Sequence, residues 1–147
     1  MNQLITNIDE YCKISEKILN QKKEINVPHV IALVGDLGSG KTTFAKSIAK
    51  VLGVTQEIIS PTFIIHREYS TSDIKKTLHH LDLYRLDHEF EIDEVGIKEL
   101  IKGQNIIVIE WADKFRKYID SLAKINNAKI TWIEIEYVDE ETRRIIL

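Results

Sequence analysis

Cysteine and proline are scarce in this chain. Its 147 residues include a single cysteine, Cys12, and two prolines. One cysteine cannot build a disulfide framework or a cysteine-based zinc site, and such sparse use of cysteine fits the reducing cytoplasm. Secreted disulfide scaffolds and cysteine-ligated zinc modules are therefore excluded.

Long apolar runs are absent as well. The longest are Val30–Val34 and Ile106–Ile109, far below the roughly 18 residues that a membrane-spanning helix needs. The N-terminus shows no basic segment followed by an apolar stretch, so no signal peptide is expected. These absences predict a cytoplasmic protein that does not associate with membranes.

Positive charge is not in excess. The formal net charge is -3, whereas dedicated nucleic-acid binders usually carry a basic face. The chain is 44% hydrophobic and 29% charged, as in ordinary globular proteins. Together with its length, this composition predicts one folded domain over residues 1–147.

Segments with two kinds of apolar spacing, one typical of strands and one typical of helices, alternate along the chain. Continuous or alternating apolar runs predict strands at 2–6, Val30–Val34, Thr62–His66, Thr77–Tyr84, Ile106–Ile109, 133–137 and 143–147. Capping-box signals at Thr6 and Asn7 predict the start of a first helix, which should fade near Lys22–Lys23. Helical spacing predicts further helices over Thr43–Leu52 up to Gly53, over Glu91–Ile101, and over Phe115–Lys124. This alternation predicts an α/β three-layer sandwich with a mainly parallel central sheet and antiparallel edge strands.

A glycine-rich segment follows the first buried strand. It matches G-x-x-x-x-G-K-[ST] at every required position, as Gly35-Asp36-Leu37-Gly38-Ser39-Gly40-Lys41-Thr42. In such a loop, backbone N–H groups and the N-terminus of the next helix point at phosphate oxygens. Lys41 would contact the β- and γ-phosphates, and the Thr42 hydroxyl would bind Mg²⁺. The segment predicts a single-domain P-loop NTPase.

Carboxylates follow two of the predicted buried strands. A P-loop protein needs an acidic residue for Mg²⁺ at the end of a neighbouring strand, and Glu110 directly follows Ile106–Ile109. Asp82 lies at the end of the Leu78–Leu83 run and is a second candidate. Trp111 comes directly after Glu110, where it could lie beside the nucleotide or pack in the core.

Several other polar residues favour structural interpretations. His79 and His80 are adjacent on a strand and point to opposite faces, so they are expected to be structural rather than metal ligands. Asp93–Gly96 matches the D-x-x-G pattern of GTPases but lies in a helical stretch, and no [NT]-K-x-D motif accompanies it. The Arg143–Arg144 pair is expected to be solvated.

The motifs together resemble a known family. Gly-Asp-Leu-Gly-Ser-Gly-Lys-Thr-Thr at 35–43, Ser-Pro-Thr-Phe at 60–63, His-Leu-Asp-Leu-Tyr-Arg at 80–85, Glu-Val-Gly-Ile at 94–97 and Ile-Glu-Trp at 109–111 occur in its order and spacing. On these motifs the chain is similar to the TsaE (formerly YjeE) ATPases of bacterial tRNA threonylcarbamoyladenosine (t6A) biosynthesis.

The resemblance implies a function. Members assist TsaD and TsaB, which modify the adenosine next to the anticodon of ANN-decoding tRNAs, and they bind and hydrolyse ATP with Mg²⁺ to reset that complex. It implies catalytic roles for Lys41, Asp82 and Glu110, and Mg²⁺ ligation by Thr42 and Glu110. It places the nucleotide against 35–43, Thr62 in the switch-like Ser60–Thr62 loop, and Trp111; tRNA would be reached only through the complex.

Two other functions share the same P-loop. A small-molecule kinase would need an acceptor pocket and a lid carrying arginines, yet the arginines here are scattered, at 67, 85, 116, 143 and 144. A nucleotide-gated binding module would use the loop to control docking without appreciable hydrolysis. Transfer of labelled phosphate to an acceptor identifies the kinase, and release of free phosphate identifies the ATPase.

Overall fold

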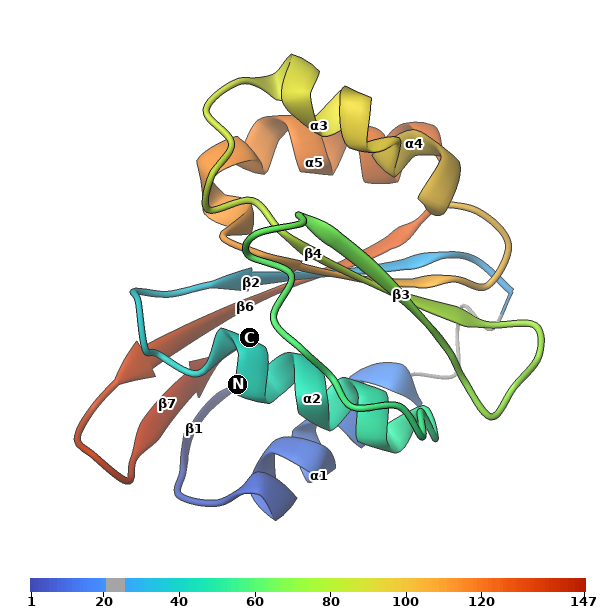
Figure 1. Ribbon diagram of the computed structural model, residues 1–147. Helices are drawn as coiled ribbons and strands as arrows, with labels where there is room; N and C mark the ends of the chain where they lie inside the picture. The colour runs from blue at the N-terminus through green and yellow to red at the C-terminus, as the bar shows by residue number, and fades with distance from the viewer. Residues whose placement is uncertain (21–25) are drawn as a thin grey trace.

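The chain forms one mixed sheet with helices on both faces (Figure 1). The computed structural model describes residues 1–20 and 26–147. The strands are β1 Asn2–Ile5, β2 His29–Val34, β3 His66–Ser70, β4 Thr77–Asp82, β5 Ile106–Glu110, β6 Lys129–Tyr137 and β7 Arg143–Ile146. The helices are α1 Ile8–Leu19, α2 Lys41–Val51, α3 Glu89–Val95, α4 Ile97–Leu100, the 3₁₀ helix η1 Ala112–Phe115 and α5 Arg116–Ile125.

The seven strands lie in the order β1-β7-β6-β2-β5-β4-β3. Strand β2 pairs in parallel with both β5 and β6, and β4 pairs in parallel with β5. Strands β1, β7 and β3 pair antiparallel with their neighbours. This arrangement confirms the predicted fold class, and it brings the carboxyl ends of β2, β4, β5 and β6 to one edge of the sheet.

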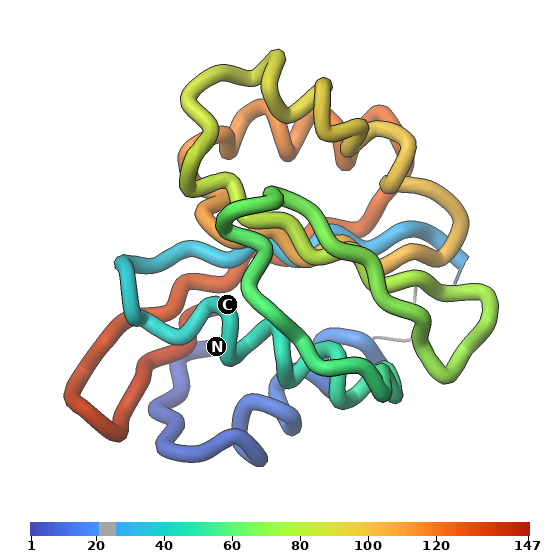
Figure 2. Tube along the Cα trace, in the orientation of Figure 1, coloured from blue at the N-terminus to red at the C-terminus, as the bar shows by residue number. Residues whose placement is uncertain are grey.

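Strand β2 shows why the continuous apolar runs are buried on both sides. Ile31 and Leu33 belong to the core that α1 and α2 cover, while Val30 and Ala32 belong to the core under α3, α4 and α5. Successive strand residues point to opposite faces, so a strand between two helical layers needs apolar residues throughout. The two chain ends meet at the edge of the sheet, where the Met1 amino group donates to the Leu147 carbonyl over 2.9 Å (Figure 2).

Two sequence predictions are wrong. Residues Thr62–His66 were expected to be extended, but the amides of Ile64 and Ile65 donate to the Pro61 carbonyl and form a turn. The strand there begins only at His66. Ile65, at the end of this turn, has a left-handed backbone with a φ of 69°. Local sequence does not predict this conformation, because it is rare for β-branched residues.

The predicted single helix over Glu91–Ile101 is two short helices. Gly96 separates them in a left-handed conformation with a φ of 80°, because a glycine ends a helix at little steric cost. The predicted end of the first helix near Lys22 and Lys23 lies outside the described residues. Within the described part of the chain, no helix is long and apolar enough to span a membrane.

Burial of His29 predicts acid-sensitive stability. Its Nε2 lies 2.9 Å from the Thr131 hydroxyl, and burial lowers the pKa of its imidazole from 6.5 to about 3. Between these values the unfolded chain binds the proton and the folded chain does not, so stability is complete above the unfolded pKa and falls as the pH drops below it. Burial lowers the pKa of His79 in the same direction, to about 4.

We therefore expect the free energy of unfolding to fall below about pH 6, with a limiting slope of about 1.4 kcal/mol per pH unit for each such histidine. Urea unfolding at a series of pH values between neutral and mildly acidic measures this slope. His29→Gln keeps a polar partner for Thr131 but does not titrate, and its slope should be shallower. If the free energy of unfolding of the variant falls with pH as steeply as that of the parent, His29 does not contribute to the acid sensitivity.

Candidate active site

The glycine-rich segment forms a tight loop between β2 and α2. Gly40 caps α2 with a φ of 108°, and Gly35 has a φ of 151°. A Cβ on Gly35 would lie 2.3 Å from the Ile135 carbonyl oxygen and 2.6 Å from Ser39 Oγ. Glycine is therefore required here for two reasons, the left-handed backbone and the close approach of β6.

Lys41 is buried at the start of α2, with 5% of its surface exposed. Its ammonium donates to the carbonyls of Gly35 over 2.6 Å and Asp36 over 2.8 Å, and it lies 3.9 Å from the centre of the Trp111 ring. Burial lowers the pKa of this amine, and nearby carboxylates, above all that of Glu110, oppose the shift. The loop thus holds a cation at its own mouth, where phosphate oxygens would replace the carbonyls as partners.

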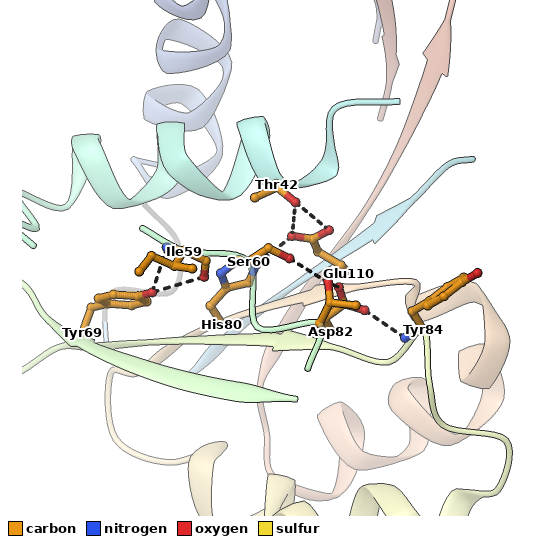
Figure 3. Close-up of polar contacts among 9 residues, drawn as sticks. Thr42, Ile59, Ser60, Tyr69, His80, Asp82, Tyr84 and Glu110 are labelled. Carbon is orange, nitrogen blue, oxygen red and sulfur yellow. Dashed lines mark hydrogen bonds and ion pairs between the residues drawn. The ribbon is translucent and has the colours of Figure 1, made fainter. Parts of the chain in front are cut away.

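Thr42 and Glu110 meet across the site. The Thr42 hydroxyl donates to both carboxylate oxygens of Glu110, over 2.9 and 3.1 Å (Figure 3). Strand β5 ends at Glu110, and α2 begins beside it, so the two oxygen ligands converge from different elements. Such oxygen donors fit Mg²⁺, which binds through one or two protein ligands together with phosphates and water.

Asp82 lies directly opposite Glu110 in the register of β4 and β5. Its Oδ2 accepts from the Thr62 hydroxyl over 2.7 Å. Its Oδ1 accepts from the Tyr84 amide over 2.9 Å (Figure 3). Thr62 in turn lies 2.8 Å from the Ser60 hydroxyl. The Ser60–Thr62 segment is thereby held to the end of β4, next to the P-loop.

Trp111 lies directly beyond β5, in a left-handed conformation with a φ of 59°. This turn carries its ring over the Lys41 ammonium and 5.0 Å from the centre of the Tyr84 ring. Cations bind to the faces of tryptophan rings, so Trp111 lies at the site and not only in the core. The ring also packs against the cluster under α5, so the core packing considered from the sequence is present.

A pocket of about 330 Å³ unites most of the predicted site residues. It is lined by Leu37, Gly38, Gly40, Lys41, Thr42, Thr43, Ser60, Thr62, Asp82, Glu110 and Trp111. Gly35, Asp36 and Ser39, also predicted from the motif, lie outside this lining. Gly35 and Asp36 bind Lys41 through their carbonyls, and Ser39 is buried behind the loop.

No three side chains among His, Cys, Asp and Glu cluster as a possible metal site in the described ranges 1–20 and 26–147. Mg²⁺ in proteins is usually held by one or two side chains together with phosphates and water, and Thr42 and Glu110 could serve as those side chains. The chemistry that this pocket supports is recognition of a polyphosphate with its metal.

Comparison with known proteins identifies the family of this chain. The family model described as Threonylcarbamoyl adenosine biosynthesis protein TsaE matches residues 5–145. This chain belongs to the TsaE family. The resemblance drawn from the motifs is thereby confirmed, and with it a connection to t6A biosynthesis.

Individual relatives support the same family assignment. The tRNA threonylcarbamoyladenosine biosynthesis protein TsaE of Rickettsia felis is 37% identical over 141 residues, which cover 95% of this chain and 75% of that protein. The Bacillus subtilis TsaE is 45% identical over 83 residues, 56% of this chain and 50% of that protein. A crystal structure of Bacillus subtilis YdiB superposes with a TM-score of 0.68 at 26% identity, covering 99% of this chain and 82% of that one.

Sequence reasoning missed two contacts in this TsaE site. His80, expected to be structural, places Nε2 2.8 Å from Glu110 Oε1. The spacing of His80 and Asp82, which places both on one face of β4, was the available signal. Arg143, expected to be solvated, donates from Nη2 to the Gly38 carbonyl over 3.4 Å. That contact depends on how β7 pairs beside the loop, which no local pattern shows.

Proposed function

We propose that this chain is an Mg²⁺-dependent ATPase that works with TsaD and TsaB in forming t6A on ANN-decoding tRNAs. In this proposal residues 1–147 act as one cytoplasmic ATPase domain that drives turnover of the complex. The observation that carries the proposal is the contact between Thr42 and Glu110, with the hydroxyl 2.9 and 3.1 Å from the carboxylate oxygens. A P-loop hydroxyl and a neighbouring-strand acid form the usual Mg²⁺ pair of P-loop NTPases.

The residues of the loop would hold the phosphates of ATP. Lys41 exchanges its contacts with the Gly35 and Asp36 carbonyls for β- and γ-phosphate oxygens, and the loop amides and the N-terminus of α2 bind the remaining charge. The nucleotide contacts proposed are Gly35, Asp36, Leu37, Gly38, Ser39, Gly40, Lys41, Thr42, Thr43, Thr62 and Trp111. Bound Mg²⁺ would supply positive charge where negative charge develops on the transferred phosphoryl group.

Two carboxylates on adjacent strands would complete the chemistry. Glu110, fixed by Thr42, is the acidic Mg²⁺ residue of the proposal. Asp82 is the second catalytic carboxylate, and both of its oxygens are held, by Thr62 and by the Tyr84 amide. The Thr62 hydroxyl donates a hydrogen bond to Asp82, and both residues line the pocket. If the γ-phosphate binds beside them, the Ser60–Thr62 segment would respond to its presence.

Reconstitution of t6A formation tests the proposal. TsaD, TsaB, tRNA and an activated threonylcarbamoyl donor are combined with or without this chain and ATP. We expect repeated turnover only when the chain and hydrolysable ATP are both present, and a single round when a non-hydrolysable analogue replaces ATP. Equal product formation without the chain would overturn the proposal.

Isolated chain should bind tRNA weakly. Its net charge is -3, and binders that track phosphates need several lysines or arginines on one face. Some of the basic side chains are paired with acids, as in Lys98–Asp93 and Arg144–Glu136. We expect no submicromolar complex with ANN-decoding tRNA in a gel shift at physiological salt, where the screening length is about 8 Å. A tight complex formed without TsaD and TsaB would contradict recruitment through protein contacts.

A further inference from the structure

His80 is buried beneath the proposed Mg²⁺ carboxylate. Only 1% of its surface is exposed, and its Nε2 lies 2.8 Å from Glu110 Oε1 (Figure 3). It shares a face of β4 with Asp82, and Asp82 pairs with Glu110 across β4 and β5. His80 therefore approaches Glu110 diagonally from the interior, on the side away from the pocket, and is absent from the pocket lining.

The chemistry of the two groups identifies the donor of this contact. An ionised carboxylate can only accept, so the proton of this contact belongs to Nε2 of His80. The other ring nitrogen, Nδ1, is buried and has no hydrogen-bond partner among residues 1–20 and 26–147. Leaving a buried polar atom unpaired is destabilising, and an apolar side chain at this position would avoid that cost.

We propose that His80 is a positioning residue that fixes the Glu110 carboxylate toward the metal ligated by Thr42. The inference rests on the proposed function, since it concerns the same site. Thr42 donates to Glu110 from the pocket side and His80 donates from the interior, so the carboxylate is held from two sides. The unpaired Nδ1 identifies the contact with Glu110 as the only hydrogen bond that the ring makes within the described chain.

Two substitutions separate positioning from packing. His80→Leu introduces an apolar side chain of similar size that has no hydrogen-bond donor. His80→Gln keeps a side-chain N–H of similar reach. Partners that orient metal ligands contribute about 10- to 100-fold in metal affinity or activity. We expect His80→Leu to weaken Mg²⁺-dependent ATP binding by that factor, and His80→Gln to restore most of it. ATP binding in EDTA should not change in either variant.

Matched controls come from the neighbouring residue. His79 is also buried, at 4% exposure, but it points to the opposite face of the strand, where its partners are His66 and Asn105. His79→Leu and His79→Gln should leave the Mg²⁺ dependence as in the parent. Melting temperatures of all four variants show whether each is folded before binding is compared.

A double-mutant cycle with Glu110→Gln tests whether His80 acts through Glu110. If His80 acts through Glu110, His80→Leu should have little further effect on Mg²⁺ affinity once Glu110 is replaced. Nitrogen-15 spectra of the histidine rings should show a protonated Nε2 for His80, and this signature should shift on addition of Mg²⁺ and nucleotide. Independent effects of the two substitutions, or a folded His80→Leu with parental Mg²⁺ affinity, would overturn the proposal. A parent that binds no Mg²⁺–ATP at all would instead overturn the proposed function.

Discussion

Replacing Lys41 with alanine should abolish tight ATP binding. The ammonium is the cation at the mouth of the P-loop, held by the Gly35 and Asp36 carbonyls over 2.6 and 2.8 Å. Its loss removes the positive charge that the β- and γ-phosphates would meet in a buried site, where charge interactions are strong. Calorimetric titration with Mg²⁺–ATP measures the effect.

Lys46→Ala is the matched control for this experiment. Lys46 lies on the same helix but is exposed, so its removal changes the net charge equally and leaves the loop intact. We expect parental affinity from Lys46→Ala and no measurable binding from Lys41→Ala. Parental ATP affinity in Lys41→Ala at low salt would refute the phosphate-binding role of the loop.

Glu110→Gln and Asp82→Asn should each leave a folded protein whose ATP hydrolysis drops by at least about 100-fold, the scale of losing one catalytic electrostatic contact. Both substitutions keep the shape of the side chain but remove its charge. At Glu110, the new amide also brings an N–H group to a place where Thr42 and His80 already donate. The effect of Asp82→Asn should appear in kcat more than in nucleotide affinity, because Lys41 and the loop remain. Glu110→Gln should lower kcat and also weaken Mg²⁺-dependent ATP binding, because the proposed metal ligand is lost.

Phosphate release in the presence of TsaD and TsaB measures this loss, and circular dichroism verifies folding. Glu94→Gln removes an exposed carboxylate of α3, far from the P-loop in sequence, and should hydrolyse ATP like the parent. If Glu110→Gln and Asp82→Asn also match the parent, the Mg²⁺ site has been assigned to the wrong carboxylates.

The sequence predicted the parts of the site that depend on one local segment. The P-loop is encoded in the spacing of its glycines, Lys41 and Thr42, and its geometry follows from the backbone those residues allow. Glu110 and Asp82 were predictable because parallel strands bring their carboxyl ends to one edge of the sheet. Each carboxylate comes at the end of an apolar run, so no knowledge of distant pairing was needed to find it.

The contacts that escaped prediction depend on how separate segments pair. His80 reaches Glu110 only because β4 lies beside β5 in the register that sets Asp82 opposite Glu110. The turn at Pro61–Ile65 and the break at Gly96 are local, but each ends in a residue with a left-handed backbone, Ile65 and Gly96. At Gly96 the residue type permits the break without requiring it, and at Ile65 the residue type argues against the turn.

The rate of phosphate release from Mg²⁺–ATP tests the central claim most directly. It is measured for the chain alone, for the chain with TsaD and TsaB, and for that mixture with an ANN-decoding tRNA. The account predicts slow release by the isolated chain, faster release in the complex, and loss of that release in Glu110→Gln. Labelled phosphate found on an acceptor rather than free in solution, or no release under any of the three conditions, would contradict it.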